Sequence, residues 1–427
     1  MALQKKYCQF TNALWNVRLI TDLMHQRSVK IDNICRMRTM KNVKVLLVAI
    51  GGYGAAYMTE LTEKDVPGVY VEGICEVMPG IEERFPVIKE RPIPLYHSLE
   101  EFYQEHEADL AVIATPMHLH YKQTKYCLEH GSNVLLEKPV CTDLEDARVL
   151  EQLEEQTGHF VTIGYQLDYR RDVLELKKDI LNGVYGKPVV LKAMQTLRRG
   201  EAYYHRNNWA GKIMVGGCAV NDSPFNNACA HQFQAMTFLL GEEIGRAAEI
   251  DTVGGELYRA NSNVENYDTV AIHAITKSGV PIYYYTTHDV KEKKIGPICE
   301  YRFEKGTVYF GKDFGEGPVN EYVAVMEDGS THSYGNVPKG KQLQKLYDSI
   351  ECTRNGGQPV CTIQCAIPHL EAVLKLSELP IRQIREEKLE HVQEEGDSFC
   401  QIHNLKQIFT ACYENQQMPT EAGADWD

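Results

Sequence analysis

The clearest hydrophobic pattern along the chain is a series of short apolar runs that alternate with amphipathic stretches. Val43 to Ile50 (VKVLLVAI) is almost unbroken apolar sequence, which is typical of a strand buried on both faces of a parallel sheet. Similar runs at 69–75, 108–114, 133–136 and 160–164 are separated by helical patterns at 55–64, 98–106, 121–129 and 144–157. This alternation predicts a doubly wound parallel sheet with right-handed crossovers over about residues 42–165.

The pattern changes after residue 165, where longer stretches alternate between apolar and polar positions. Residues 189–196, 269–276, 281–288 and 298–303 predict half-exposed strands, and helices are expected near 168–182, 228–240, 341–354 and 398–414. The predicted fold class is α/β. It has an N-terminal Rossmann domain over 40–165 and a C-terminal α+β domain over 166–427 on an open, mainly antiparallel sheet. One arrangement left open is that the C-terminal helix packs back on the first domain.

Residues 1–39 differ in composition from the rest of the chain. They carry seven Lys and Arg residues against Asp22 and Asp32, and Met40 directly precedes the first convincing strand. Two interpretations stay open: a helical extension of the first domain, or a natural start at Met40.

Composition and charge bear on the class of partner. At 427 residues the chain exceeds the size that one hydrophobic core usually serves, which favours two domains. The net charge of −14 disfavours nucleic acid and anionic membrane, because both bind clustered positive charge. The apolar runs stay below the roughly 20 residues that span a bilayer. The 13 cysteines lack zinc-type spacing, so we expect reduced thiols, no metal and a cytoplasmic protein.

The loop after the first strand has the features of a dinucleotide-binding turn. In AIGGYG, Gly51 and Gly54 take the second and third glycine positions of GxGxxG, and Ala49 takes the first. Gly51 would let backbone N–H groups approach a pyrophosphate, Gly54 would let helix and strand pack closely, and Gly52 and Tyr53 complete the loop. The phosphates would meet the electropositive helix N-terminus. A turn without ligand is the alternative interpretation.

Glu76 makes the cofactor prediction more specific. It ends the second strand 22 residues after Gly54, where an acidic side chain can accept hydrogen bonds from both ribose hydroxyls. Because a carboxylate at this point repels a 2′-phosphate, the sequence predicts NAD rather than NADP. The alternative is a solvated strand end.

Several motifs resemble the Gfo/Idh/MocA oxidoreductases, named after glucose-fructose oxidoreductase and inositol dehydrogenase. The stretch WAGKIMVGGCAVNDSPFNNACAHQFQAMTFLLGE resembles that family's glycine-pair, histidine and Leu-Leu-Gly pattern, so the resemblance extends from about Lys41 to the C-terminus. Three shorter segments match as well: Glu137-Lys138-Pro139 after a buried strand, Thr115, Pro116 and His120 in an ATPxxxH segment, and Gly164-Tyr165-Gln166 at the end of the nucleotide domain.

The resemblance implies a nicotinamide site between the domains and a homo-oligomer, dimer or tetramer, formed through the back of the open sheet. It implies Lys138 and His231 as the catalytic pair. Asn227 stands where the family commonly has aspartate, so we expect it to hydrogen-bond a substrate hydroxyl. The remaining cofactor-binding residues would be Thr115, Pro116, His120, Glu137 and Gln166, and Tyr165 and Asp222 would contact substrate, although an Asp before Ser-Pro is equally a turn residue.

Upstream of His231, the segment RRGEAYYHRNNWAGK concentrates side chains that suit sugar recognition. Arg206 and Trp209 offer planar hydrogen bonding and stacking, and we include both among the substrate-binding residues. His288 could line the same cleft, although an ordinary strand-end histidine explains it more simply.

Together these features predict an NAD-dependent oxidoreductase that oxidises or reduces a secondary hydroxyl of a sugar, glycoside or polyol. In one variant the cofactor is recycled during a later elimination or epimerisation. His231 would act as base near pH 7, and Lys138 would stabilise the alkoxide or carry the proton, in an order that the sequence leaves open. The alternative is a sensor that binds NAD or sugar without turnover, and the intact Lys138 and His231 pair favours the enzyme.

Overall fold

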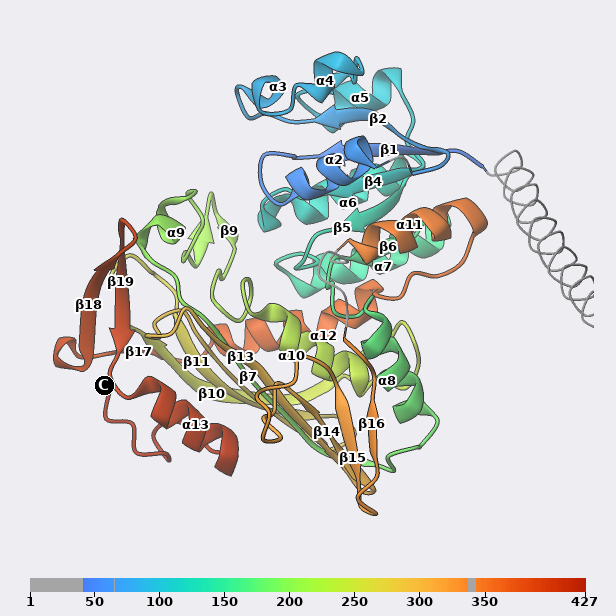
Figure 1. Cartoon of the computed structure of the whole chain (residues 1–427). Helices are drawn as coiled ribbons and strands as arrows, with labels where there is room; N and C mark the ends of the chain where they lie inside the picture. Colours follow the sequence, from blue (N-terminus) through green and yellow to red (C-terminus); the bar gives the residue numbers. More distant parts are fainter. Residues whose placement is uncertain (1–40, 65, 337–342) are drawn as a thin grey trace, which may run out of the picture.

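The computed structural model describes residues 41–64, 66–336 and 343–427, which form two domains, each built on one large sheet (Figure 1). The interpretations of residues 1–39 and Met40 fall outside the described residues. No helix in the described ranges combines the length and the apolar character needed to cross a bilayer.

The first sheet is the predicted parallel Rossmann sheet, with six strands in the order β3-β2-β1-β4-β5-β6. Strand β1 pairs in parallel with β2 on one side and with β4 on the other, so the carboxyl ends of the central strands meet at one edge of the sheet. The strands are β1 (Val43–Val48), β2 (Val69–Cys75), β3 (Leu95–Tyr96), β4 (Leu110–Ile113), β5 (Asn133–Leu136) and β6 (Val161–Ile163).

Helices cover both faces of this sheet. One face packs against α5 (Leu99–Glu105), α6 (His120–Glu129) and α7 (Leu144–Thr157), whose apolar residues share a core with Leu46 and Val48. Side chains of Ser98 and Asp143 cap α5 and α7 by accepting backbone N–H bonds. The opposite face carries α2 (Gly54–Glu63) and the short helices α3 (Ile81–Arg84) and α4 (Val87–Glu90).

The rest of that second face is covered by a helix from much later in the chain. Leu346 and Ile350 of α11 (Gln344–Asn355) pack in one buried cluster with Val43, Val45 and Leu47 of β1. Figure 1 shows α11 beside β5, which it contacts together with β1 and β4. The sequence analysis left this role open to the C-terminal helix, whereas the structure gives it to α11.

The second sheet has nine strands in the order β16-β15-β14-β13-β7-β12-β11-β10-β17. Neighbours are antiparallel except for β7 with β12 and β10 with β17, so the sheet is mainly antiparallel as predicted. The strands are β7 (Pro188–Leu197), β10 (Ile250–Arg259), β11 (Thr269–Thr276), β12 (Pro281–Thr287), β13 (Lys294–Phe303), β14 (Gly306–Phe310), β15 (Val323–Met326), β16 (Thr331–Ser333) and β17 (Ile381–Gln383).

The two faces of the second sheet have different partners. The inner face packs against α8 (Arg171–Leu181), α10 (Ala230–Leu239) and α12 (Ile363–Ser377), in the same hydrophobic cluster that reaches into the Rossmann domain. The outer face packs against α13 (Leu405–Asn415) and the hairpin of β18 (Leu389–Glu394) and β19 (Asp397–Ile402). The helix expected over 398–414 is therefore a strand followed by a helix.

Shorter elements complete the fold. Figure 1 shows α9 (Glu201–His205) and β9 (Cys218–Ala219) beyond the second sheet, on the side of the Rossmann domain. The two-residue strand β8 (Met214–Val215) pairs with β9. The 3₁₀ turns are η1 (Met117–Leu119) and η2 (Glu386–Lys388).

Candidate active site

A cavity of about 800 Å³ lies where the carboxyl ends of β1, β2, β4 and β5 face the second domain. Open α/β sheets bind ligands at this edge. Most of the sequence-predicted site residues line it: Gly51, Gly52, Tyr53, Glu76, Thr115, Pro116, Glu137, Lys138, Gln166, Arg206, Trp209, Asn227 and His231.

The glycine loop forms one end of this cavity, and its geometry fits a pyrophosphate. A Cβ atom on Gly54 would lie 1.9 Å from the carbonyl oxygen of Ala49, so only glycine allows this packing of helix on strand. A Cβ atom on Gly52 would meet nothing within 4 Å, which leaves room for a ligand. Among the described contacts, the N–H groups of Gly52, Tyr53 and Gly54 donate to no protein acceptor. They begin α2, where an anion is favoured.

Glu76 is fixed at the same end of the cavity by four backbone N–H groups. Its Oε2 atom accepts from Ile50 and Gly51 at 2.7 and 2.8 Å. Its Oε1 atom accepts from Val77 and Met78 at 2.8 and 2.9 Å. These bonds hold the carboxylate against the glycine loop, in the position that a cofactor ribose would reach.

Glu137, at the end of β5, and Lys345, on α11, form a buried ion pair. The Nζ atom of Lys345 on α11 donates to Glu137 at 2.5 Å and to the carbonyl oxygen of Gly164 at 3.0 Å. The hydroxyl of Tyr57 also donates to Glu137, at 2.6 Å. Burial raises the pKa of Glu137, but Lys345, the Tyr57 bond and Lys138 more than offset this and leave its pKa below the ordinary value. Glu137 is therefore anionic.

Lys138 points away from its neighbour Glu137 and toward the second domain. Its Nζ atom donates to the backbone oxygen and to Oδ1 of Asn227, both at 2.8 Å. The amide nitrogen of Asn227 donates in turn to Asp222 at 2.8 Å. Burial lowers the pKa of Lys138 to about 8, and the positive charge of Lys345 acts in the same direction, against Glu137 and Asp222. Lys138 thus titrates close to physiological pH.

His231 lies in the first turn of α10 and lines the cavity opposite the Rossmann domain. Burial, followed by the charges of Lys138 and Lys345, holds the pKa of His231 well below its usual range. Its Nδ1 atom is buried and bonds to no partner in the described part of the chain. The ring of Tyr165 meets it edge-on at 5.9 Å between centroids. His231 is therefore a neutral imidazole with a free polar atom.

Four predicted site residues lie behind the cavity wall. His120 is buried and bridges the carbonyl oxygens of Thr115 and Pro139, at 3.0 and 2.6 Å. Gly54 packs against Ala49, and Asp222 reaches the cavity only through Asn227. The expectation that His120, Asp222 and Tyr165 contact ligand directly does not match the cavity that the structure forms, whereas the close packing predicted at Gly54 is confirmed. They hold the groups that line it.

Tyr165 departs furthest from its predicted role as a substrate contact. Its side chain is fully buried, and its hydroxyl bonds to Nδ1 of His369 on α12 at 2.9 Å. The physical reason is the continuous core between the domains, which takes up the ring as an apolar residue. The tyrosine therefore supports His231.

Lys345 is a buried charged cavity residue that the sequence analysis missed. It sits on the buried side of an amphipathic helix, between Leu343 and Leu346. A lysine among apolar helix positions is ordinarily read as reaching past the core to solvent. The buried Glu137, whose carboxylate binds it, is far away in the sequence and gives no local signal.

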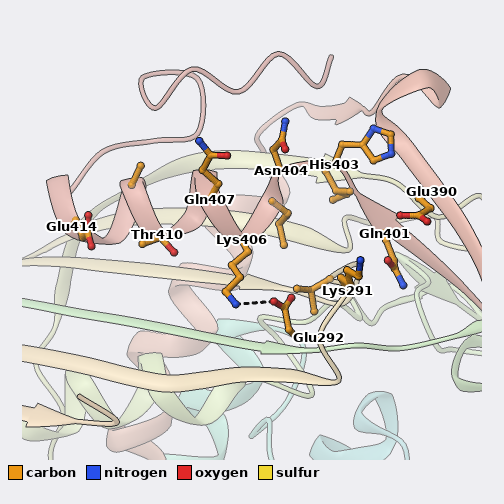
Figure 2. Close-up of a pocket in the computed structure, with 14 residues that line it drawn as sticks. Lys291, Glu292, Glu390, Gln401, His403, Asn404, Lys406, Gln407, Thr410 and Glu414 are labelled. Carbon is orange, nitrogen blue, oxygen red and sulfur yellow. Dashed lines mark hydrogen bonds and ion pairs between the residues drawn. The ribbon is translucent and has the colours of Figure 1, made fainter. Parts of the chain in front are cut away.

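A second cavity, of about 690 Å³, lies on the outer face of the second sheet (Figure 2). It is bounded by α13, β19 and the loop at residues 290–292, and the ion pair of Lys406 and Glu292 at 2.8 Å bridges two of these segments. All predicted site residues lie elsewhere, so the first cavity is the candidate active site.

Comparison with known proteins points to one family. Residues 43–165 match the family model GFO_IDH_MocA, described as an oxidoreductase family with an NAD-binding Rossmann fold. Inositol 2-dehydrogenase 2 of Mycolicibacterium vanbaalenii is 23% identical over 327 residues, which cover 74% of this chain and 87% of that protein. Inositol 2-dehydrogenase of Mycolicibacterium smegmatis is 27% identical over 210 residues, 48% of this chain and 55% of that protein.

Solved structures share the fold. The WlbA dehydrogenase from Bordetella pertussis, in complex with NADH and UDP-GlcNAcA, has a TM-score of 0.65 at 19% identity, over 79% of this chain and 97% of that one. UDP-N-acetylglucosamine 3-dehydrogenase GnnA from Acidithiobacillus ferrooxidans has a TM-score of 0.61 at 14% identity, over 79% and 97%. Residues 43–165 therefore match the GFO_IDH_MocA family of oxidoreductases with an NAD-binding Rossmann fold, and most of the chain shares its two-domain fold with these solved dehydrogenases.

Proposed function

We propose that the protein is an NAD-dependent dehydrogenase that acts on a secondary hydroxyl of a sugar, glycoside or polyol. One observation carries the proposal. Lys138 from the first domain and His231 from the second line the same cavity, whose other end holds the glycine loop and Glu76. The inositol dehydrogenases among the relatives support a polyol or sugar as substrate.

The residues present fit NAD, which would be held by two groups of contacts. The free N–H groups of Gly52, Tyr53 and Gly54 would bind its pyrophosphate, and Glu76 would accept hydrogen bonds from its adenosine ribose. The cofactor, when bound, supplies a hydride acceptor for the substrate carbon. The protein itself must place the substrate and manage the hydroxyl proton.

Lys138 is the group best suited to accept that proton. A base works best when its pKa lies near the working pH, and the pKa of Lys138 is about 8. A neutral Lys138 would take the hydroxyl proton, and the resulting ammonium would stabilise the oxygen while negative charge develops. Its bonds to Asn227 hold Nζ on the side of the second domain, where the substrate would lie.

His231 has a different role in this proposal. Because its pKa lies well below 6.5, it stays neutral and is a weaker base than Lys138. Its unpaired Nδ1 atom can exchange a hydrogen bond with the reacting hydroxyl or its neighbour. We assign His231 to orienting the substrate. It also shares the hydroxyl proton with the substrate oxygen once that oxygen carries negative charge. The sequence analysis expected His231 to act as base near pH 7, and burial weighs against that role.

Lys345 acts indirectly, through Glu137. An unpaired Glu137 would attract the adjacent ammonium of Lys138 and keep it protonated. By binding the carboxylate at 2.5 Å, Lys345 leaves Lys138 free to bond to Asn227. It is a positioning residue.

The experiment is to add inositols, hexoses and methyl glycosides to the protein with NAD and to follow the absorbance of NADH. NADH is measured both in solution and bound to the enzyme. A cofactor that is recycled during the reaction stays on the enzyme, so its reduced form does not accumulate in solution. We expect reduction with at least one class of substrate. Lys138→Ala and His231→Ala should bind NAD normally and lose about 100-fold or more in hydride transfer, the usual scale for a positioned acid–base group. Equal turnover by either variant would contradict its assigned role, and NAD binding without reduction by any sugar would favour a sensor.

A further inference from the structure

Positive side chains collect at the end of the cavity that the second domain forms, although the whole chain carries a net charge of −14. Arg206 lines this end, and Lys138 faces it from the first domain. The acidic lining residues are Glu76, bound by backbone N–H groups at the glycine loop, and Glu137, paired with Lys345. Within the described residues, Arg206 and Lys138 make no ion pair, so this end of the cavity favours a negative group.

A second arginine stands next to Arg206, on the same tyrosine ring. The guanidinium carbons of Arg199 and Arg206 lie 4.7 and 3.5 Å from the ring centroid of Tyr203, and Arg206 also lies 5.2 Å from the ring of Trp209. These contacts fix the two planar groups while leaving most of their N–H donors available. Arg206 donates to the backbone oxygen of Tyr203 at 2.6 Å. The Nε atom of Arg199 is buried and bonds to nothing in the described part of the chain.

The orientation of Arg199 follows from strand β7. Leu191 and Ala193 pack into the inner core, and alternation along the extended chain puts Arg199 on that face. Its neighbour Arg198 lies on the outer face instead, where it pairs with Glu394 at 2.6 Å and stacks on Phe399 at 4.4 Å. Of the two adjacent arginines, Arg199 is the one that stacks on Tyr203, which Arg206 also contacts.

His288 adds an unpaired polar atom beside this pair. It is 1% exposed, its Nδ1 atom bonds to the hydroxyl of Tyr204 at 2.9 Å, and its ring lies 5.3 Å from that of Tyr203. Its Nε2 atom has no partner among the described residues. Burial, then Arg199 and Arg206, hold the pKa of His288 well below its usual range, so it adds a hydrogen-bonding group and no charge.

Asp222 is the carboxyl group that could neutralise the two arginines, and it is already engaged. Its Oδ2 atom accepts from the N–H of Gly211 at 2.7 Å, and its Oδ1 atom accepts from Asn227 at 2.8 Å. Both oxygens thus accept hydrogen bonds already, one of them from the residue that holds Lys138.

We infer that Arg199 and Arg206 form an anion-binding subsite, and that the substrate is a sugar or polyol derivative that carries a carboxylate or a phosphate. The inference rests on the proposed function, because it names the class of substrate for the same cavity. The anionic group binds the two guanidinium groups, while the reacting hydroxyl lies between Lys138 and His231. Guanidinium groups recognise carboxylate and phosphate alike through paired N–H donors. The two arginines therefore select for a negatively charged substituent and do not distinguish between these two kinds.

The test compares kcat/KM for matched neutral and anionic substrates. Methyl glycosides, the corresponding methyl uronides and the 6-phosphates are used in the gluco, galacto and manno series with NAD. We expect an anionic member to exceed its neutral counterpart by about 100-fold, the scale of two charge-assisted contacts. The uronides and the phosphates separate the two kinds of anion.

Three variants test the assignment of residues. Arg199→Gln and Arg206→Gln should each raise KM for the anionic substrate by about tenfold or more, a clearly larger rise than for the matched neutral glycoside, with NAD affinity nearly unchanged. Arg199→Lys, which keeps the charge, should recover part of the loss. Arg198→Gln is the matched control and should change nothing, because Arg198 lies on the outer face.

The outcomes separate the two proposals. If neutral glycosides react as well as the uronides and phosphates, the anion subsite is wrong and the dehydrogenase proposal stands. An equal loss on neutral and anionic substrates in Arg199→Gln and Arg206→Gln, or a loss of NAD affinity, would also overturn the subsite. If no compound of either charge reduces NAD, the dehydrogenase proposal fails, and the subsite falls with it.

Discussion

Lys138 and His231 face the same cavity with proton affinities that burial has lowered to different extents. Lys138 titrates at about 8, and the pKa of His231 lies well below its ordinary value of 6.5. Burial penalises the charged form of both groups, and Glu137 and Asp222 partly restore the proton affinity of Lys138. The difference assigns the titration that matters near neutral pH to the lysine.

The direction of the pH dependence follows from this assignment. Oxidation needs neutral Lys138, so its kcat should rise with pH through about 8 and then level off. Reduction needs the ammonium, so its kcat should fall through the same pH. Steady-state rates from pH 6 to 10 in both directions measure this. A rise of the oxidation kcat near pH 6 that is lost in His231→Ala would show that the histidine is the base.

Lys345 should set the pH at which the oxidation kcat rises, here called the oxidation limb of the pH profile. In Lys345→Met, the repulsion between two cations is lost and Glu137 becomes free to attract Lys138, and both changes raise the pKa of Lys138. The oxidation limb should move to higher pH, and kcat at pH 7 should fall by about tenfold for each pKa unit of the shift. Lys345→Arg keeps the charge and should stay near wild type. A lower kcat with an unmoved limb would mean that Lys345 is only structural.

At this scale the sequence predicts residues that belong to local motifs and misses those defined by long-range contacts. Lys138, Glu137 and Glu76 follow buried strands, and their places at the cavity follow from the parallel sheet. Lys345 could not be found in this way, because its partner Glu137 lies 208 residues away in the sequence. The buried environment of Tyr165 depends on α12, which the apolar pattern did not reveal.

At the scale of elements, the turn between β1 and α2 contains one strained residue. Ala49 has a φ of 66°, in the left-handed region that glycine adopts without cost, and its carbonyl oxygen packs under Gly54. An alanine in this conformation costs about 1–2 kcal/mol. Ala49 thus takes the first glycine position of the loop at the cost of a left-handed backbone conformation.

Ala49→Gly should therefore stabilise the protein. The gain from relieved strain exceeds the entropy that glycine loses on folding, so the free energy of unfolding should rise by about 0.5–1 kcal/mol. Urea denaturation followed by circular dichroism measures the change. Ala55→Gly, within helix α2, is the matched control and should lower the free energy of unfolding by about 1 kcal/mol. A destabilised Ala49→Gly protein would show that the left-handed conformation carries no strain.

The end of β2 governs the choice of cofactor. Because four N–H groups hold the Glu76 carboxylate in place, it cannot swing away from a 2′-phosphate. NAD should therefore bind at least about tenfold more tightly than NADP, as expected for like charges at close range. Glu76→Gln keeps one acceptor oxygen for the loop and should narrow this preference. Fluorescence titration with both cofactors measures it, and Glu72→Gln on the same strand, where the side chain faces His106, is the control. Equal affinities in the wild-type protein would contradict the prediction.

Among the elements, strong apolar runs are easy to predict and composite segments are not. The bounds of β2, β5 and α7 match the sequence analysis, since each has an uninterrupted pattern with clear end signals. The helix α12 was missed because Pro368 interrupts its apolar pattern, and a proline ordinarily disfavours a helix interior. Residues 397–402 pair with β18, a contact that no local pattern of β19 contains.

For the whole molecule, two domains are joined by one hydrophobic core. A single cluster of buried residues runs from the Rossmann sheet through α10 and α12 to the inner face of the second sheet. The pattern of strands and helices predicts both sheets, because their periods differ. It does not predict which helix covers the rest of the second face of the first sheet, since any amphipathic helix has an apolar side that could do so. The predicted homo-oligomer stays a prediction that analytical ultracentrifugation can test.

The placement of α11 has a consequence for synthesis on the ribosome. Residues 41–166 contain every strand of the first sheet, yet the apolar face over β1, β4 and β5 stays uncovered until Leu346 and Ile350 arrive. The N-terminal domain therefore cannot finish folding when its own strands have emerged. It must wait until about residue 355 has left the exit tunnel, so part of the apolar sheet face stays exposed while residues 167–355 are synthesised. The first domain thus depends on a helix from far along the chain, which makes it a natural client for chaperones that bind nascent chains.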